Sequence, residues 1–223
     1  MKELFDKRYP VTSSLLIVSI FIFLIMFLMR GTDYASGQTL YDFGAMYGLA
    51  IRTFPNQLWR LISAIFVHIG FEHLLMNMVT LYFLGRQVEG IFGSKKFLIL
   101  YLFSGLMGNV AVFLWTPNVI AAGASTSLYG LFASIIVLRY AVNNPYIQQL
   151  GQSYLILFVL NVGFSLMMPG ISLAGHLGGA IGGALLAVLL PIRGERYAYS
   201  SWQRILALLV YLLLFIGSIF LGF

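Results

Sequence analysis

Apolar stretches of helical length alternate with short polar segments along the chain. A helix that crosses the hydrocarbon core of a bilayer needs about 20 predominantly apolar residues, and several stretches reach or approach that length. In chain order they cover residues 11–29, 61–85, 97–115, 125–141, 154–168, 171–190 and 205–223. This pattern predicts an all-α fold: a polytopic membrane protein with about seven transmembrane helices, without internal repeats or a second domain.

Two segments depart from the regular pattern. The stretch at 125–141 is short for a complete span, so we expect it to begin within the depth of the membrane. Residues 30–60 form the one long polar segment, and glycine and proline residues interrupt any long helix there. The same segment holds several aromatic residues, whose rings favour the membrane–water interface. We therefore expect residues 30–60 to lie at that interface.

The composition excludes several classes of protein. Hydrophobic residues make up 60% of the 223 residues and charged residues only 9%, whereas a soluble domain carries about 25% charged residues. The chain has no cysteine, which excludes a disulfide scaffold, Cys-ligated metals and thiol catalysis. The basic residues do not cluster, so we expect the lipid bilayer and not nucleic acid as a partner, despite the net charge of +6.

The positions of the basic residues predict the orientation in the membrane. Ten lie in ends and loops of one side and three on the other, and basic loops favour the cytoplasm. We expect a cytoplasmic N-terminus and, after seven spans, an external C-terminus. The ten are Lys2, Lys7, Arg8, Arg86, Lys95, Lys96, Arg139, Arg193, Arg196 and Arg204, and the three are Arg30, Arg52 and Arg60.

The first apolar stretch bears on the location of the protein. Residues 11–29 are longer than the core of a signal peptide, and no small-residue cleavage site follows them, so we expect a retained first helix. The protein is then a multi-pass protein of the cell membrane. The absence of cysteine and of other targeting signals fits a bacterial plasma membrane.

The second apolar stretch contains polar side chains, which are rare in membrane-spanning segments. His73 and Asn77 are four residues apart and share one helix face. Polar groups inside lipid are costly and face the bundle interior or a water-filled cavity. His68 precedes Gly70, which places it on the loop that enters the helix. The pair therefore offers hydrogen-bond donors on one surface, although a polar clamp between helices is an equal alternative.

The fourth stretch begins with Ser125, directly after Gly123 and Ala124. A serine at a helix N-terminus is commonly an N-cap. The same geometry also suits a nucleophile, because free backbone N–H groups and the positive end of the helix dipole stabilise an oxyanion. Tyr129 lies one turn on, on the same face, whereas Ser127 points elsewhere. Of the serines in this segment, Ser125 is the better candidate nucleophile.

The sixth stretch carries two ridges of glycine and one histidine. Gly175, Gly179 and Gly183 form one ridge, and such ridges let two helix backbones approach closely. Gly178 and Gly182 form the second ridge. Close approach to the fourth helix would bring His176 near Ser125, and the alternative is plain tight packing around a satisfied histidine.

These residues suggest a Ser–His dyad, because no carboxylate lies deep in another helix to complete a triad. His176 would act as the base toward Ser125 and then as the acid toward the leaving amine. A metal held by the three histidines is a weaker alternative, because the HEXXH motif and an aligned acidic ligand are missing. We therefore expect neither a metal nor a cofactor.

In this order along the chain, the residues resemble the rhomboid family of intramembrane serine proteases. The resemblance extends from about residue 59 to residue 190, and each piece is weak alone while the ordered series is specific. The pieces are Trp59-Arg60, His68-x4-His73-x3-Asn77, Leu84-Gly85-x2-Val88-Glu89, Phe92-Gly93, Gly123-Ala124-Ser125 with Tyr129, and Gly175-His176-x2-Gly179.

The resemblance implies both an architecture and roles for residues. It implies a cytoplasmic N-terminus at 1–10, a six-helix core at 11–191, and a cytoplasmic linker with an extra C-terminal transmembrane helix at 192–223. The segment 30–60 would be a partly membrane-embedded first loop. The implied roles are nucleophile for Ser125, general base and acid for His176, oxyanion donors for His73 and Asn77, a ring stacked on the histidine for Tyr129, and structural support for His68, Trp59, Arg60 and Glu89.

One residue departs from the family pattern, because Thr126 stands where the family usually has glycine after the nucleophile. A β-branched side chain there would crowd the start of the helix. The main hypothesis is an endopeptidase that cleaves transmembrane proteins near the external membrane face. The alternatives are a weak or inactive rhomboid-like protein that binds transmembrane clients and, less favoured, a small transporter that relays protons through histidines.

Overall fold

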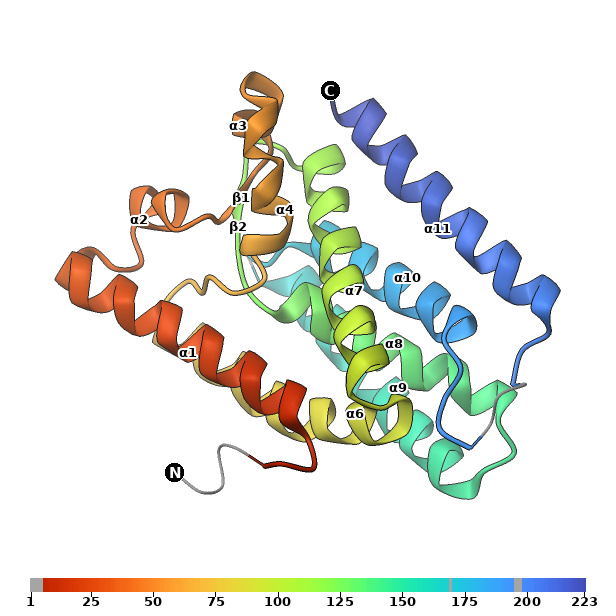
Figure 1. The fold of residues 1–223 in the computed structure, drawn as a ribbon. Helices are drawn as coiled ribbons and strands as arrows, with labels where there is room; N and C mark the ends of the chain where they lie inside the picture. Colours follow the sequence, from red (N-terminus) through yellow and green to blue (C-terminus); the bar gives the residue numbers. More distant parts are fainter. Residues whose placement is uncertain (1–5, 169, 195–197) are drawn as a thin grey trace.

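The computed structural model describes residues 6–168, 170–194 and 198–223, which form a bundle of helices (Figure 1). Within these residues the only strands are β1 (Met46–Tyr47) and β2 (Ile120–Ala121). The prediction of an all-α, polytopic membrane bundle is confirmed. The start of α1 (Pro10–Arg30) and the end of α11 (Ser201–Gly222) lie at opposite ends of the bundle.

The apolar helices fall into two length classes. Helices α1, α7 (Ser94–Trp115), α9 (Pro145–Met167) and α11 are long and apolar enough to cross a membrane. Helices α8 (Ser125–Ala141) and α10 (Leu173–Leu189) have 17 residues each. At about 1.5 Å per residue they are about 25 Å long, shorter than a hydrocarbon core of about 30 Å. Their N-termini can therefore lie below the membrane surface, as expected for residues 125–141.

The second apolar stretch, predicted at 61–85 with His68 on a loop that enters its helix, is divided at that loop. The chain forms α4 (Arg60–Ser63), then a loop that ends at Gly70, where φ is +85°. The helix restarts as α5 (Phe71–Thr80) and continues through the π-helical η3 (Leu81–Gly85) into α6 (Arg86–Phe92). Gly93, with φ of +82°, ends it. The expected loop around His68 thus separates the short helix α4 from α5, although most residues in the loop are apolar.

Helix α9 begins at Pro145 and not near residue 154. The Asn144 side chain accepts hydrogen bonds from the N–H groups of Tyr146 and Ile147, and Pro145 occupies the first turn. These are strong helix-start signals. Glutamines in the first turns made this part of the helix look like a loop when only apolar residues were counted.

The polar segment 30–60 folds into short elements, as its glycines indicated. These are η1 (Gly31–Asp33), α2 (Gly37–Asp42), β1, α3 (Gly48–Thr53) and η2 (Pro55–Trp59). Strand β1 pairs antiparallel with β2, with Met46 opposite Ala121. Since β2 leads directly into α8, this segment supports the chain just before Ser125.

Arg60 holds that segment together from the inside. It is buried, and its Nη1 donates to the carbonyl groups of Tyr41 at 2.6 Å and Ala45 at 3.1 Å. The guanidinium also lies 3.9 Å from the centre of the Tyr41 ring. The neighbouring Trp59 is half exposed, and its ring covers Gly44, where a Cβ would meet it. Both residues therefore stabilise the fold of this segment.

The glycine ridges of α10 pack against two different helices. A Cβ at Gly179 would overlap the carbonyl group of Thr126 on α8, and a Cβ at Gly183 would overlap the backbone of Gly130. On the second ridge, a Cβ at Gly178 would come within 2.5 Å of the Cβ of Ala111 on α7. The missing side chains therefore allow α10 to contact α7 and α8 almost backbone to backbone.

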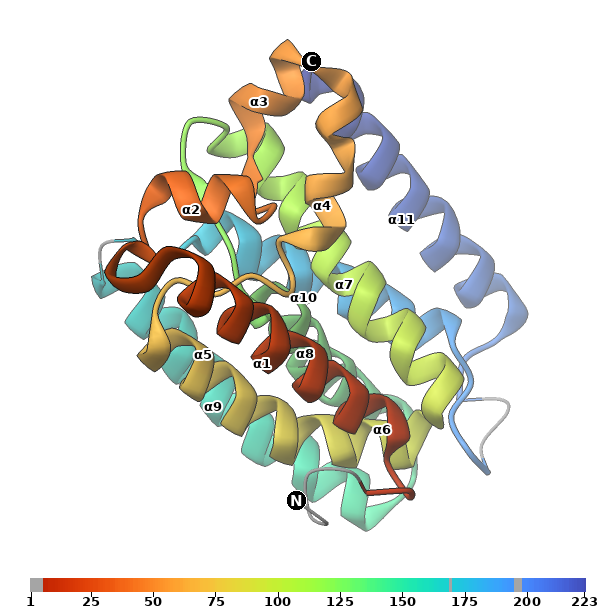
Figure 2. The ribbon, with the colours of Figure 1, turned by 60° about the vertical axis from the view of Figure 1, so that its left-hand side comes forward.

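The N-terminal end of α1 is tied to α6, and α1 runs along α5 (Figure 2). The buried carboxylate of Glu89 accepts hydrogen bonds from the N–H groups of Val11 at 3.1 Å and Thr12 at 2.8 Å, and from the Thr12 hydroxyl at 2.7 Å. A carboxylate at this position also interacts favourably with the positive end of the helix dipole. Glu89 thus caps α1 from a neighbouring helix.

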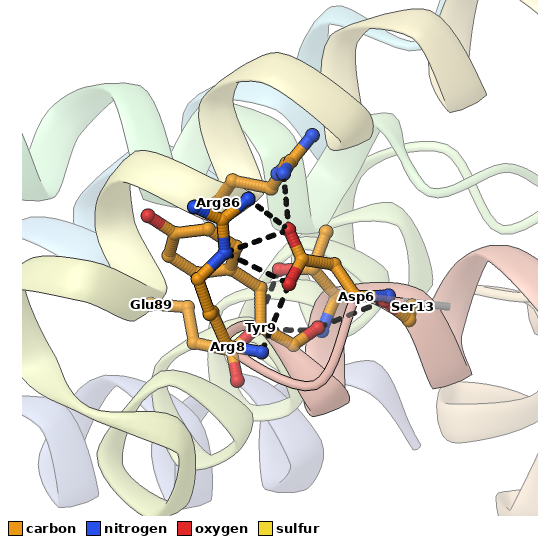
Figure 3. Close-up of polar contacts among 7 residues, drawn as sticks. Asp6, Arg8, Tyr9, Ser13, Arg86 and Glu89 are labelled. Carbon is orange, nitrogen blue, oxygen red and sulfur yellow. Dashed lines mark hydrogen bonds and ion pairs between the residues drawn. The ribbon is translucent and has the colours of Figure 1, made fainter. Parts of the chain in front are cut away.

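A second contact beside this cap joins Asp6 to two arginines (Figure 3). The Asp6 carboxylate accepts from Arg8 at 2.8 Å and also from Arg86 of α6. The hydrogen bonds from Arg8 hold the pKa of Asp6 well below its usual range, and the charge of Arg86 acts in the same direction. The segment before α1 is therefore anchored to α6 by charge.

Several of the ten basic residues assigned to the cytoplasmic side contact one end of the bundle. Lys96 donates to the carbonyl group of Pro191 at 2.6 Å, and Arg204 donates to that of Leu189 at 3.0 Å. The Arg193 side chain lies against Gly93. Lys2 and Arg196 belong to the same predicted group but lie outside the described residues.

Candidate active site

A cavity of about 610 Å³ lies between α5, α8, α9 and the start of α10. Polar side chains in its lining include His73, Asn77, Ser125, Ser165 and His176, and also Glu72, Thr80, Asn109, Thr126, Asn161 and Ser172. Most of the remaining lining is apolar. An apolar cavity with a few convergent polar groups is typical of a binding or catalytic site.

Ser125 is the first residue of α8, and Ala124 is the N-cap residue. No side chain caps this helix, so the role of N-cap that we considered for Ser125 does not apply. The Ser125 side chain instead lies within hydrogen-bonding distance of His176, with 3.0 Å between Oγ and Nε2. The positive end of the α8 dipole lies at the same hydroxyl.

The close packing of α10 on α8 positions His176. The first glycine ridge removes the side chains between the two helices, which lets the imidazole reach across to Ser125. Tyr129, one turn along α8, stacks on the imidazole with ring centres 4.0 Å apart and an interplanar angle of 12°. Both rings are buried, so the imidazole has little freedom to turn away from Ser125.

His73 and Asn77 lie on the same wall of the cavity, on α5. The N–H group of Ile69 donates to His73 Nδ1 at 3.3 Å, so Nδ1 is the unprotonated nitrogen and Nε2 carries the proton. The His73 ring packs against Gly123, where a Cβ would come within 2.8 Å of Nε2. Asn77 Nδ2 donates to the His73 carbonyl at 2.8 Å, which uses one of its two amide protons.

His68 lies on the loop before α5, where the sequence placed it, and it is fully buried. Its Nδ1 lies 3.1 Å from the carbonyl of Phe66, and its Nε2 accepts the N–H group of Ala124 at 3.3 Å. The N–H group of Gly123 donates to the carbonyl of Ala64 at 2.9 Å. These contacts hold the two residues immediately before Ser125 in place.

Of the predicted site residues, the structure brings five together at the cavity and leaves four outside it. Ser125, His176, His73, Asn77 and Tyr129 all line the cavity. The four others support it from a distance or hold other parts of the fold; they are His68, Trp59, Arg60 and Glu89.

The structure has room for the β-branched side chain of Thr126. The side chain packs against Gly108 of α7 and Gly175 of α10, where added Cβ atoms would come within 2.7 and 3.0 Å of it. Helix α8 still begins at Ser125, at the predicted residue. The glycines on both neighbouring helices therefore accommodate the departure from the family pattern.

Sequence reasoning missed Ser165, which lies on α9 and contacts His176. Ser165 Oγ lies 3.0 Å from His176 Nδ1 and 3.1 Å from the hydroxyl oxygen of Tyr129. The signal in the sequence was a polar pair, Asn161 and Ser165, four residues apart in an otherwise apolar stretch. The same reasoning that singled out His73 and Asn77 applies to this pair.

Comparison with known proteins matches the part of the chain that contains these site residues. The Rhomboid domain model matches residues 55–193. Rhomboid protease GluP of Bacillus subtilis (strain 168) is 29% identical over 211 residues, which cover 95% of this chain and 40% of that protein. Putative rhomboid protease YdcA of the same organism is 28% identical over 197 residues, or 87% of this chain and 95% of that protein. RHOMBOID-like protein 2 of Arabidopsis thaliana is 29% identical over 196 residues, which cover 82% of this chain and 62% of that protein.

Proposed function

Because this chain belongs to the rhomboid family, we propose that it is an intramembrane serine endopeptidase that cleaves transmembrane proteins with a Ser125–His176 dyad. The observation that supports this most is the contact of 3.0 Å between Ser125 Oγ and His176 Nε2, beside a helix N-terminus in a mostly apolar cavity. A nucleophile and base within hydrogen-bonding reach, with the base held by further groups, is the arrangement that serine hydrolases need.

The proposed reaction begins when His176 Nε2 takes the proton from Ser125 Oγ, which attacks the carbonyl carbon of a peptide bond. The resulting tetrahedral intermediate collapses as His176 gives that proton to the leaving nitrogen, and the C–N bond breaks. A water molecule then gives a proton to His176 and attacks the acyl ester. The ester bond breaks, the carboxyl product leaves, and Ser125 regains its proton.

The oxyanion in this proposal is held by donors on two elements. The donors are the Nε2–H of His73, the free amide proton of Asn77 and the backbone N–H of Ser125, and all three residues line the same cavity. Donors held in place before the reaction stabilise the developing charge without reorganisation. The contacts of His68 with Ala124 and of Ala64 with Gly123 keep the third donor in position.

The substrate class follows from the chemistry of the cavity. Its mostly apolar lining suits a segment that leaves the lipid, and the attacked carbonyl must lose its helical hydrogen bond first. We therefore expect cleavage in segments of transmembrane proteins that unwind easily, at small or helix-breaking residues. The cut would lie near the external face, where the N-termini of α8 and α10 begin.

The same proposal includes a topology. Residues 1–10 would be cytoplasmic, residues 11–191 would form the six-helix core, and residues 192–223 would supply a linker and an extra transmembrane helix that ends outside. The contacts of Lys96 and Arg204 at one end of the bundle support this orientation, because basic residues favour the cytoplasmic face. A bacterial plasma membrane fits the composition.

The test is a cleavage assay in proteoliposomes with several labelled transmembrane substrates. We expect the wild type to cut at least one of them, and Ser125→Ala and His176→Ala to reduce cleavage to background. Ser127→Ala is a matched control on the same helix, because the Ser127 hydroxyl lies against Gly105 of α7 and Ser127 does not line the cavity.

Two outcomes would contradict the proposal. Cleavage that persists in Ser125→Ala would exclude Ser125 as the nucleophile. A folded wild-type protein that cuts none of the substrates, but binds them, would favour a rhomboid-like client-binding protein.

A further inference from the structure

The second ring nitrogen of His176 has a partner that the dyad does not include. His176 Nδ1 lies 3.0 Å from Ser165 Oγ, and both side chains are buried. In a Ser–His–Asp triad an aspartate holds this nitrogen and so selects the tautomer that can act as a base. Here a hydroxyl on α9 stands at the equivalent position.

Ser165 makes three polar contacts, and their geometry suits a single arrangement of protons. Its hydroxyl donates to the carbonyl of Asn161 at 2.8 Å, and it lies 3.1 Å from the Tyr129 hydroxyl and 3.0 Å from His176 Nδ1. A serine hydroxyl has one proton and two lone pairs. If the proton goes to Asn161, the lone pairs accept Tyr129 O–H and His176 Nδ1–H.

We propose that Ser165 is a positioning residue: its hydroxyl accepts the Nδ1–H of His176 and thereby keeps the lone pair of Nε2 directed at Ser125. This inference rests on the proposed function for its effect on rate, but the proton position exists whether or not the protein cleaves a substrate. Tyr129 contributes twice, because its ring stacks on His176 and its hydroxyl contacts Ser165.

The kinetic test compares Ser165→Ala with Ser165→Thr, which keeps the hydroxyl. We expect kcat to fall about tenfold in Ser165→Ala, the loss of roughly one hydrogen bond, and to recover to within about threefold of wild type in Ser165→Thr. KM should stay within about twofold, because the role is exerted through His176. A KM change with unchanged kcat would show instead that Ser165 contacts substrate and would overturn the proposal.

Ser153→Ala is the matched control on the same helix. Ser153 is exposed, and its hydroxyl donates to the carbonyl of Gln149 at 3.2 Å, the same backbone contact that Ser165 makes with Asn161. We expect Ser153→Ala to leave kcat and the thermal midpoint unchanged. An equal loss of kcat in Ser153→Ala and Ser165→Ala would show a general effect on α9 and contradict the proposal.

A spectroscopic test is independent of activity. The chain has three histidines, so 15N solid-state NMR of histidine-labelled protein in bilayers resolves few ring signals, and His176→Ala assigns those of His176. We expect Nδ1–H for His176 in the wild type and in Ser165→Thr, and a mixture of tautomers in Ser165→Ala. The signals of His73 should not change.

The two readouts separate the inference from the function. A wild-type His176 that carries its proton on Nε2, or a tautomer that Ser165→Ala leaves unchanged, would overturn the role of Ser165. A wild type that shows the expected tautomer but cleaves nothing would contradict the proposed function and leave the positioning contact standing.

Discussion

Helix α10 carries His176, and helix α9 carries Ser165, which contacts His176. The two helices pack in opposite ways. Helix α10 contacts α7 and α8 through glycines, with almost no side chain between the backbones. Helix α9 buries only Ile147, Gly151, Tyr154 and Ser165, and it exposes many large apolar side chains that suit contact with lipid. The distance from His176 to Ser125 therefore depends on backbone contacts that cannot adjust, whereas the contact from Ser165 comes from a loosely packed helix.

This difference suggests a division of labour around the cavity. The elements α5, α8 and α10 hold the groups that we propose to touch the reacting atoms, and backbone hydrogen bonds and glycine contacts keep these groups in place. Helix α9 adds a hydroxyl that acts through His176. We expect substitutions on the first three elements to cost more than substitutions on α9.

The largest effect is expected at Asn77. Asn77→Ala removes one proposed oxyanion donor, and the loss of one such donor typically reduces the rate by about 10²–10³. We expect kcat for a transmembrane substrate to fall by that amount, while the rate of substrate binding stays the same. If kcat falls less in Asn77→Ala than in Ser165→Ala, the expectation that substitutions on α5 cost more than those on α9 would be contradicted.

The next largest effect is expected at the glycine ridge. In Gly179→Ala the new Cβ would overlap the Thr126 carbonyl, so α10 must move away from α8. Displacement of a catalytic group by about 1 Å can cost about 10²-fold in rate, and overpacking typically costs about 1–3 kcal/mol of stability. We expect both kcat and the thermal midpoint to fall.

The matched control for that substitution is on α9. A Cβ at Gly163 would meet no atom within 4 Å, so Gly163→Ala should leave the dyad unchanged. We expect its kcat to stay within about twofold of wild type, because alanine also favours the helix more than glycine does. Equal losses in Gly163→Ala and Gly179→Ala would contradict the contrast between the two helices.

A smaller effect, on stability alone, is expected where α6 caps α1. Glu89→Gln keeps one acceptor oxygen but removes the charge and part of the cap formed with Val11 and Thr12. Loss of a charged hydrogen bond costs about 1.5–3 kcal/mol, so we expect a lower thermal midpoint. The rate per folded molecule should not change, since Glu89 does not line the cavity.

The smallest effect concerns pH and Asp6. Its lowered pKa means that the contact with Arg8 stabilises the folded state above the ordinary pKa of an aspartate, about 3.9, and that this stability is lost as the pH falls through the lowered folded value. We expect the difference in thermal midpoint between wild type and Asp6→Asn to stay constant from pH 7 to about pH 5. This difference should become smaller at more acidic pH. A difference that already becomes smaller near neutral pH would contradict the lowered pKa of Asp6.

The sequence predicted the parts of the site that depend on regular spacing. Glycines at every fourth position of α10 predict a close helix contact, and Ser125 at the start of a short apolar stretch predicts a helix terminus with free backbone N–H groups within the depth of the membrane. Ser165 forms a polar pair with Asn161 that could have marked this face of α9, but its contact with His176 could not be predicted, because it depends on how α9 lies against α10. Gly70 and His68 indicated the loop before α5, but not the contact between Ala64 and Gly123 that supports it, because this contact joins segments far apart in the sequence.

The central claim is that His176 activates Ser125, and labelling with a serine-reactive fluorophosphonate tests it most directly. We expect labelling of the wild type at Ser125, none in Ser125→Ala, and labelling slowed by about 10²-fold or more in His176→Ala, the usual contribution of a general base. Labelling of Ser125 at the same rate in His176→Ala, or labelling at another serine, would contradict the account.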